Sequence, residues 1–361
     1  MITTLILFFI LLSVLIISHE CGHFFSARVF GIRVDEFGFG LPPRITGIMR
    51  NGTLYSINWL PFGGFVKIHG EKGDSGGDQN SFANKPAWAR SLVLLAGVLS
   101  NIVLAFILMS AVVSLGMPEA IDEADRSLYP DAELAISGVV PGGSADKAGI
   151  QAGDYIRTIA AENAILVRPQ KISDIQELIK QNTNKEVIFK IKRDGQNLEK
   201  SVLVRANSPS GEGPTGIELS WVHTKKVIWY MMPIEGAKLT YNITNATVEG
   251  LWGVVTNLFS HGTPGVEVAG PVGIFNLVGS TRHAGISSFL FFMAVLSINL
   301  ALINVLPIPG LDGGRFLFVI IEAIRGKRIS QKVSAITHGL GFIALLVLML
   351  FITFLDIAKV F

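Results

Sequence analysis

Four long apolar stretches constrain the fold of this 361-residue chain more than any other feature of its sequence. A helix needs about 20 mostly apolar residues to cross a bilayer. Only 16% of the residues are charged and 50% are apolar, whereas a typical soluble domain has about 25% charged residues. We therefore predict a polytopic α-helical membrane protein with about four transmembrane helices. The stretches are residues 2–27, 91–117, 286–324 and 333–355.

Charge and cysteine content narrow the possible classes of partner and site. The net charge is +2 and no segment is dense in Lys or Arg, so we expect no nucleic-acid partner. Cys21 is the only cysteine, which excludes an intrachain disulfide. The first apolar stretch lacks the basic residues and the small-residue cleavage site of a signal peptide, so we expect a retained membrane helix.

The third apolar stretch is interrupted by helix-breaking residues, namely Pro307, Pro309, Gly310, Gly313 and Gly314. Irregular backbone at membrane depth is tolerated only where protein or water surrounds it. The break therefore points to a site in the membrane part of the chain.

Basic residues predict the orientation of the chain in the lipid bilayer. They are concentrated in residues 28–90 and 325–332. Because short cytoplasmic loops are enriched in Lys and Arg, we expect both segments on the cytoplasmic side. Both termini and the long 118–285 segment are then expected to be extracytoplasmic.

Residues 32–69 have the pattern of a β-hairpin rather than that of a helix. Apolar residues flank Asn51-Gly52, a strong signal for a two-residue hairpin turn. We expect a membrane-associated β-hairpin sheet, followed by a polar, glycine-rich loop over residues 71–80. The hairpin either pairs with an extended peptide as an added strand or serves only as a structural cap, and the sequence leaves both open.

The first apolar stretch ends in His19-Glu20-Cys21-Gly22-His23, which is an HExxH motif. On a helix, His19 and His23 lie one turn apart on the same face, so both imidazoles can bind one Zn²⁺. Glu20 is placed to take a proton from water activated by that metal. Ionisable residues at the end of an apolar helix are costly in lipid and by default indicate function.

A catalytic zinc usually has three protein ligands, so the motif needs one more. Asp312 is the candidate, because it lies in the broken stretch and is the only acid between Glu267 and Glu322. Considered alone, an aspartate before Gly-Gly at a chain break is as consistent with a helix cap or turn as with a metal ligand. Because the HExxH motif supplies only two of the three ligands, we favour the role of metal ligand for Asp312.

The two motifs together resemble the site-2 protease family of intramembrane zinc metalloproteases. The first is HExxH in the first membrane helix, and the second is NxxPxPxxDGG over residues 304–314. Residues 269–274 resemble the GPVG segment of that family. Residues 82–101 resemble its entry into the second span, with Val98 where proline is usual.

This resemblance implies the chemistry of the site. Zn²⁺ would be held by His19, His23 and Asp312. Glu20 would act as the general base that activates water for attack on a peptide carbonyl. The family acts on single-span membrane proteins, commonly anti-sigma factors or signal-peptide remnants, in regulated intramembrane proteolysis. The resemblance therefore implies such substrates. The architecture suggests a bacterial or organellar inner membrane, and we expect the bacterial one.

The resemblance also implies that Asn304 and Asn299 bind substrate, because their spacing before the proline pair matches the family. An asparagine amide can hold a substrate backbone or polarise a carbonyl. Helix–helix hydrogen bonding, which is common in membranes, is the alternative for both residues.

Residues 133–205 are predicted to form a compact α/β block with a helix near 172–181. Residues 138–156 resemble PDZ domains of the bacterial protease type, which bind extended peptides or C-termini by strand addition. We therefore expect one extracytoplasmic PDZ-like α/β domain. The expected domains are 1–117 for the first membrane half, 133–205 for the PDZ-like domain, 218–285 for an amphipathic interfacial segment and 286–361 for the second membrane half.

Two other functions remain open from the residues alone. A membrane transporter with a metal or proton site would account for ionisable residues in a broken helix, although not for the HExxH spacing. An inactive scaffold would leave the PDZ-like domain as the only active part, although Glu20 is present.

Overall fold

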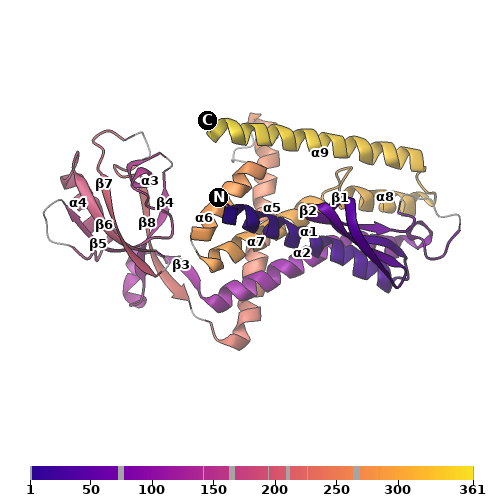
Figure 1. Ribbon diagram of the computed structural model, residues 1–361, viewed down its shortest axis with the longest axis horizontal. Helices are drawn as coiled ribbons and strands as arrows, with labels where there is room; N and C mark the ends of the chain where they lie inside the picture. The colour runs from indigo at the N-terminus through magenta and orange to yellow at the C-terminus, as the bar shows by residue number, and fades with distance from the viewer. Residues whose placement is uncertain are drawn as a thin grey trace. The chain divides into compact units, whose positions relative to one another are not determined.

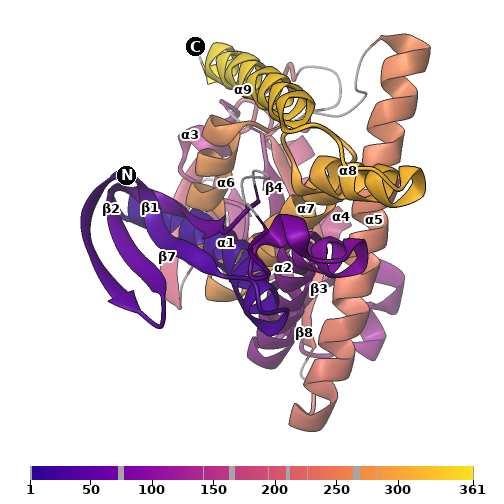
Figure 2. The same ribbon diagram turned by 90° about the vertical axis from the view of Figure 1, so that its right-hand side faces the viewer.

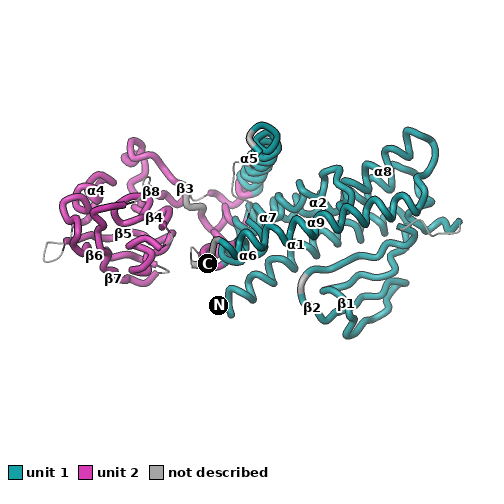
Figure 3. The backbone as a smooth tube through the Cα atoms, turned by 90° about the horizontal axis from the view of Figure 1, so that it is seen from above, with its two compact units in different colours: residues 1–110, 233–278, 290–361 teal, residues 111–232, 279–289 magenta. Residues whose placement is uncertain are grey.

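The computed structural model describes residues 2–71, 77–140, 142–161, 167–193, 195–208, 212–225, 227–262, 269–283 and 285–360. These residues form two compact units, which are coloured separately in Figure 3. The first unit comprises Met1–Ser110, Pro233–Val278 and Leu290–Phe361, and the second comprises Ala111–Met232 and Gly279–Phe289.

Four of the described helices are long and apolar enough to cross a membrane, as the sequence predicted. They are α1 (Ile2–Val29), α2 (Ala87–Leu115), α7 (Ile286–Val305) and α9 (Gln331–Val360), and their ribbons are labelled in Figures 1 and 2. Shorter or more polar helices accompany them: η1 (Phe82–Asn84), α5 (Met232–His261), α6 (Pro271–His283) and α8 (Asp312–Arg325).

Helices α1 and α2 run antiparallel and pack closely. Ser18 Oγ donates to Ser100 O at 3.3 Å, and His23 Nδ1 lies 2.8 Å from Val93 O. A Cβ atom at Gly22 would lie 2.2 Å from the carbonyl oxygen of Ala96, so only glycine permits this approach. The close contact places the HExxH turn directly against α2.

The predicted break in the third apolar stretch is confirmed. Helix α7 ends at Val305 and α8 begins at Asp312, with residues 306–311 between them. A Cβ atom at Gly313 would lie 2.2 Å from Leu306 O, so glycine allows the connecting loop to lie against the start of α8. The loop therefore presents Asp312 at the first position of α8.

The predicted hairpin is also confirmed. Strands β1 (Val34–Arg50) and β2 (Thr53–Ile68) pair antiparallel. Asn51 and Gly52 connect them with φ values of 48° and 77°, the left-handed conformation that a two-residue hairpin turn needs. Phe24 of α1 packs edge-on against Phe37 of β1, which joins the hairpin to the first helix. Within the predicted loop 71–80, residues 72–76 lie outside the described residues.

The second unit contains a six-stranded sheet whose described pairs are all antiparallel. The strand order is β3-β8-β4-β5-β6-β7. The strands are β3 (Met117–Ile121), β4 (Glu133–Val139), β5 (Tyr155–Ala161), β6 (Glu186–Arg193), β7 (Gln196–Leu203) and β8 (Ile217–Lys225).

Short helices complete this unit: η2 (Glu123–Leu128), α3 (Ser144–Lys147), α4 (Ile172–Gln181) and η3 (Trp229–Met231). Helix α4 matches the helix predicted near 172–181. Asp174 accepts the backbone N–H groups of Gln170 and Lys171 at 2.8 and 2.9 Å, and these bonds lower the pKa of its carboxyl group. Ile175 and Ile179 face the core, so the amphipathic face of α4 packs on the sheet.

The prediction of one amphipathic segment over residues 218–285 is wrong at its N-terminal end. Residues 217–225 form β8, which pairs with β3 and with β4. Trp221 is 4% exposed within the core of the sheet, where Ile136 and Phe189 are also buried. The α/β block thus extends beyond 133–205, because pairing with distant strands, rather than local amphipathicity, decides where residues 217–225 lie.

Candidate metal centre

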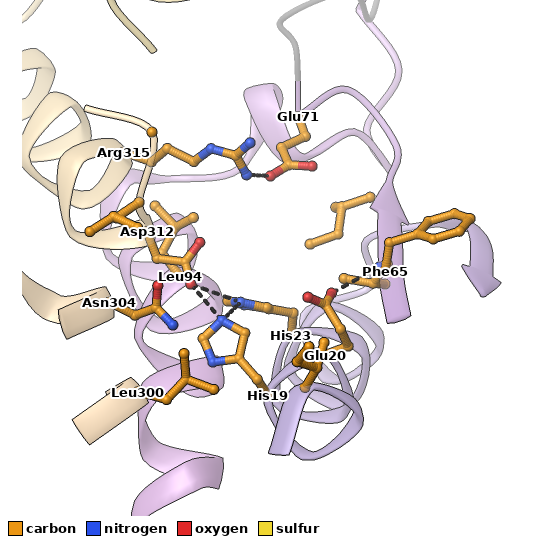
Figure 4. Close-up of a pocket in the computed structure, with 15 residues that line it drawn as sticks. His19, Glu20, His23, Phe65, Glu71, Leu94, Leu300, Asn304, Asp312 and Arg315 are labelled. Atoms are coloured by element: carbon orange, nitrogen blue, oxygen red, sulfur yellow. Dashed lines mark hydrogen bonds and ion pairs between the residues drawn. The ribbon is translucent and has the colours of Figure 1, made fainter. Parts of the chain in front are cut away.

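Helix α1 presents two imidazoles on one face. His19 and His23 are four residues apart, their ring centroids are 4.7 Å apart, and their Nε2 atoms are 3.2 Å apart. They are 8% and 6% exposed. Figure 4 shows both rings pointing toward Asp312. The one-turn spacing that the sequence predicted therefore brings both nitrogens to a common point.

The hydrogen bond to α2 fixes the tautomer of one imidazole. A carbonyl oxygen only accepts, so the 2.8 Å contact between His23 Nδ1 and Val93 O requires a hydrogen on Nδ1. In the neutral ring, Nε2 of His23 then carries the lone pair. That lone pair points at His19 and at the carboxylate of Asp312, as a metal ligand would.

Asp312 supplies the third donor. Its Oδ2 atom lies 2.8 Å from Nε2 of His19 and 3.1 Å from Nε2 of His23. Leu311 is the N-cap residue of α8 and Asp312 is the first residue of the helix, so Asp312 does not occupy the position of a helix N-cap. Among the described residues, the three donors form a group whose atoms all lie within 4.8 Å of one another.

The donor set fits zinc. Zn²⁺ prefers nitrogen and carboxylate oxygen ligands, and a catalytic zinc keeps three protein ligands and one open position. Two imidazole lone pairs facing one carboxylate oxygen are mutually repulsive unless a cation or a proton lies between them. This arrangement matches a three-ligand catalytic metal site.

Glu20 lies next to the donor cluster without belonging to it. Its Oε2 atom accepts the backbone N–H of Val66, in β2, at 2.8 Å. Residues one apart on a helix point about 100° away from each other, so Glu20 faces the hairpin while His19 faces Asp312 (Figure 4). This position suits a base that acts beside the metal.

The donors and Glu20 line one cavity of about 370 Å³. Of the two asparagines singled out from the sequence, Asn304 lines this cavity and Asn299 does not. Figure 4 shows Asn304 beside Asp312. The remaining lining residues are Ile16, Phe65, Val66, Ile68, Glu71, Leu94, Leu300, Gly310, Leu311 and Arg315.

An ion pair in the cavity wall was not predicted from the sequence. Arg315 of α8 pairs with Glu71, which follows β2. The position of Arg315, three residues after Asp312, places it within one helical turn of the candidate ligand and could have indicated it. No comparable signal marks Glu71, because its role depends on where the hairpin ends.

Comparison with known proteins identifies the family. The profile described as Peptidase family M50 matches residues 7–348. The chain belongs to peptidase family M50, the site-2 protease family. It is therefore a membrane metalloprotease, and zinc is its cofactor.

Three similar proteins extend this finding. "Regulator of sigma-W protease RasP" of Bacillus subtilis (strain 168) is 29% identical over 440 aligned positions, which cover 100% of this chain and 99% of that protein. "Zinc metalloprotease RasP" of Bacillus licheniformis is 28% identical, with 99% of each chain covered. "Membrane metalloprotease ARASP, chloroplastic" of Arabidopsis thaliana is 30% identical, covering 96% of this chain and 76% of that protein.

Proposed function

We propose that this M50 protease cleaves single-span membrane proteins within or beside the bilayer, as a step of regulated intramembrane proteolysis. The observation that carries the proposal is the convergence of His19, His23 and Asp312 at one end of an apolar helix. Membrane-bound anti-sigma factors are the first substrate class to test, since one relative is named a regulator of sigma-W. Signal-peptide remnants are the second class.

We assign the metal to Nε2 of His19, Nε2 of His23 and Oδ2 of Asp312. When bound, zinc supplies Lewis acidity that lowers the pKa of water and polarises a peptide carbonyl. Glu20 takes the proton of the attacking water and later donates it to the leaving amine. Its hydrogen bond to Val66 N–H holds the carboxylate at the edge of the cavity until then.

Asn304 is assigned to substrate binding. It lines the cavity beside Asp312, so its amide N–H₂ group can donate to the substrate carbonyl or backbone. Asn299 lies five residues earlier on α7, outside the set of cavity-lining residues. We therefore propose the direct role for Asn304 and, for Asn299, the alternative role of helix–helix hydrogen bonding.

The C-terminal part of β2 is the proposed guide for an extended substrate. Phe65, Val66 and Ile68 line the cavity. A transmembrane substrate hides its scissile carbonyl in helical hydrogen bonds, so it must unwind before the attack. An unwound segment can pair with the edge of β2 by strand addition, which brings its backbone past Glu20.

The α/β block around residues 133–205 is proposed to be a PDZ-like domain that binds an extended peptide or a C-terminus. In the proposed topology, this block and both termini are extracytoplasmic in a bacterial inner membrane. Cysteines at Lys327 and Ser208, introduced into a Cys21→Ala background, should then react with an impermeant thiol reagent from opposite sides. Reaction from the same side overturns the topology.

Cleavage of a single-span reporter protein in detergent tests the chemistry. Glu20→Gln keeps the size of the side chain but removes its basicity, so turnover should fall by about 10²–10⁴-fold. Zinc content should stay at that of the wild type, because the three proposed ligands are intact. Asp356→Asn, which changes an acid outside the cavity, is the control and should cleave normally. Normal cleavage by Glu20→Gln would overturn the assignment.

A further inference from the structure

Two buried polar groups near the metal donors have no hydrogen-bond partner among the described residues. One is Nδ1 of His19, and the other is the whole side-chain amide of Asn101, both its oxygen and its nitrogen. Asn101 is fully buried, with 0% exposure. Because the large majority of buried side-chain polar atoms in folded proteins are hydrogen-bonded, these two groups need an explanation.

Asn101 lies on the face of α2 that meets the imidazoles. It follows Gly97 by four residues, and residues four apart share one face of a helix. The backbone of Gly97 touches both rings: a Cβ atom there would lie 2.4 Å from Nε2 of His23 and 2.8 Å from Cε1 of His19. Asn101 is therefore one helical turn from the point where α2 contacts the site.

The directions of the two side chains converge. In an α-helix, each side chain leans toward the N-terminus of its own helix. Since α1 and α2 are antiparallel, the ring of His19 leans toward the level of Ser100 and Asn101. The carboxamide of Asn101 leans the opposite way, toward Gly97. The two unpartnered groups thus point into the same region between the helices.

Their hydrogen-bonding chemistry is complementary. Nε2 of His19 faces the other two donors. When this atom binds the metal, the neutral ring of His19 carries its hydrogen on Nδ1. A metal-ligating histidine almost always donates this second N–H to a carboxylate, a carbonyl or water. His23 does so to Val93 O, at 2.8 Å. No described residue plays this part for His19.

We propose that Asn101 is a positioning residue for His19. Its carboxamide oxygen accepts the Nδ1–H of His19 through one bridging water, and so fixes the tautomer and the angle of the ring. The proposal rests on the proposed role of His19 as a metal ligand. Asn101 does not line the catalytic cavity, so it acts only through His19.

Zinc affinity, measured by competition with a chelator on the full-length protein in detergent, tests this role. Asn101→Leu has a similar size and no acceptor, and it should weaken zinc binding by about 10–100-fold, the effect typical of a lost partner to a ligating histidine. Asn101→Asp restores an acceptor and should bind zinc within about threefold of the wild type. Ser297→Ala removes only the bond to the backbone oxygen of Asn101, and should leave zinc affinity unchanged.

A spectroscopic readout separates positioning from packing. In zinc-loaded protein with ¹⁵N-labelled histidine, the wild type should show a His19 Nδ1–H signal protected from exchange with water. The signal should disappear in Asn101→Leu and persist in Ser297→Ala. Its absence from the wild type would overturn the proposal, as would wild-type zinc affinity in Asn101→Leu.

The test also distinguishes this proposal from the metal-site assignment. If His19→Ala loses zinc while Asn101→Leu binds it normally, the assignment holds and the role of Asn101 is overturned. If His19→Ala keeps its zinc, the assignment itself is overturned, and the role of Asn101 with it.

Discussion

Helix α1 and the Gln331–Ala358 part of α9 are both candidate spans of 28 residues, and each carries histidine and an acid within an apolar sequence. In the most apolar window of α1, 28% of the residues are buried, compared with 6% in α9. In α1, His19 and His23 face another side chain, the carboxylate of Asp312. The histidine of α9 faces backbone instead: His338 Nδ1 accepts the N–H of Gly310 at 3.1 Å.

Asp356, the acid of α9, also faces a backbone group. It is 8% exposed, and its Oδ2 atom accepts the N–H of Gly273, in the first turn of α6, at 2.8 Å. Helix N-termini leave N–H groups unsatisfied, so a carboxylate there is stabilised without any metal. The comparison teaches that hydropathy finds both spans, while the convergence of several donor side chains on one point distinguishes the candidate metal centre in α1 from the attachments made by α9.

The largest expected effect comes from replacing an aspartate with asparagine, once at the candidate metal centre and once in α9. Asp312→Asn should remove nearly all bound zinc and all measurable cleavage, because losing a direct ligand costs more than the 10–100-fold in affinity of a lost outer partner. Asp356→Asn should keep both. Zinc content by elemental analysis and cleavage of a single-span reporter measure the difference. Full zinc retention in Asp312→Asn would remove the distinction between the two helices.

A second contrast uses one glycine in each helix. A Cβ atom at Gly22 would lie 2.2 Å from Ala96 O, while one at Gly339 of α9 would meet nothing within 4 Å. Gly22→Ala should lower the free energy of unfolding by about 1–3 kcal/mol through overpacking. Gly339→Ala should leave it unchanged or raise it by up to about 1 kcal/mol, because alanine is the better helix former. Reversible thermal unfolding in detergent gives both values, and equal destabilisation would contradict the difference in packing.

The same contrast shows what the sequence could predict. The HExxH spacing placed His19 and His23 on one helical face, and the broken third stretch pointed to Asp312, because these features depend on local periodicity and on residue type. The hairpin around Asn51-Gly52 was predictable for the same reason.

Features that depend on distant backbone were not predictable. Nothing in the sequence marks Val93 O as the partner of His23, or Val66 N–H as the partner of Glu20, because every residue carries the same backbone groups. Strand β8 was missed since its place in the sheet depends on pairing with β3 and β4 across long separations in the chain.

The smallest effect tests whether α9, the less buried helix, also supports the site. His338 binds the N–H of Gly310, two residues before Asp312, and a Cβ atom at Gly341 would lie 1.9 Å from Pro309 O, so α9 touches the loop that presents the ligand. His338→Leu removes an acceptor whose net contribution is about 1 kcal/mol, so cleavage and zinc affinity should each fall by roughly fivefold.

His338→Asn is the matched variant, since its side-chain oxygen can replace Nδ1 as the acceptor. It should restore most of the loss, because the bond to Gly310 N–H, rather than the imidazole itself, holds the loop. If both variants behave as the wild type, α9 is only attached to the site and does not position it. If both lose zinc as completely as Asp312→Asn, His338 contributes to the metal centre directly, and the division between α1 and α9 is wrong.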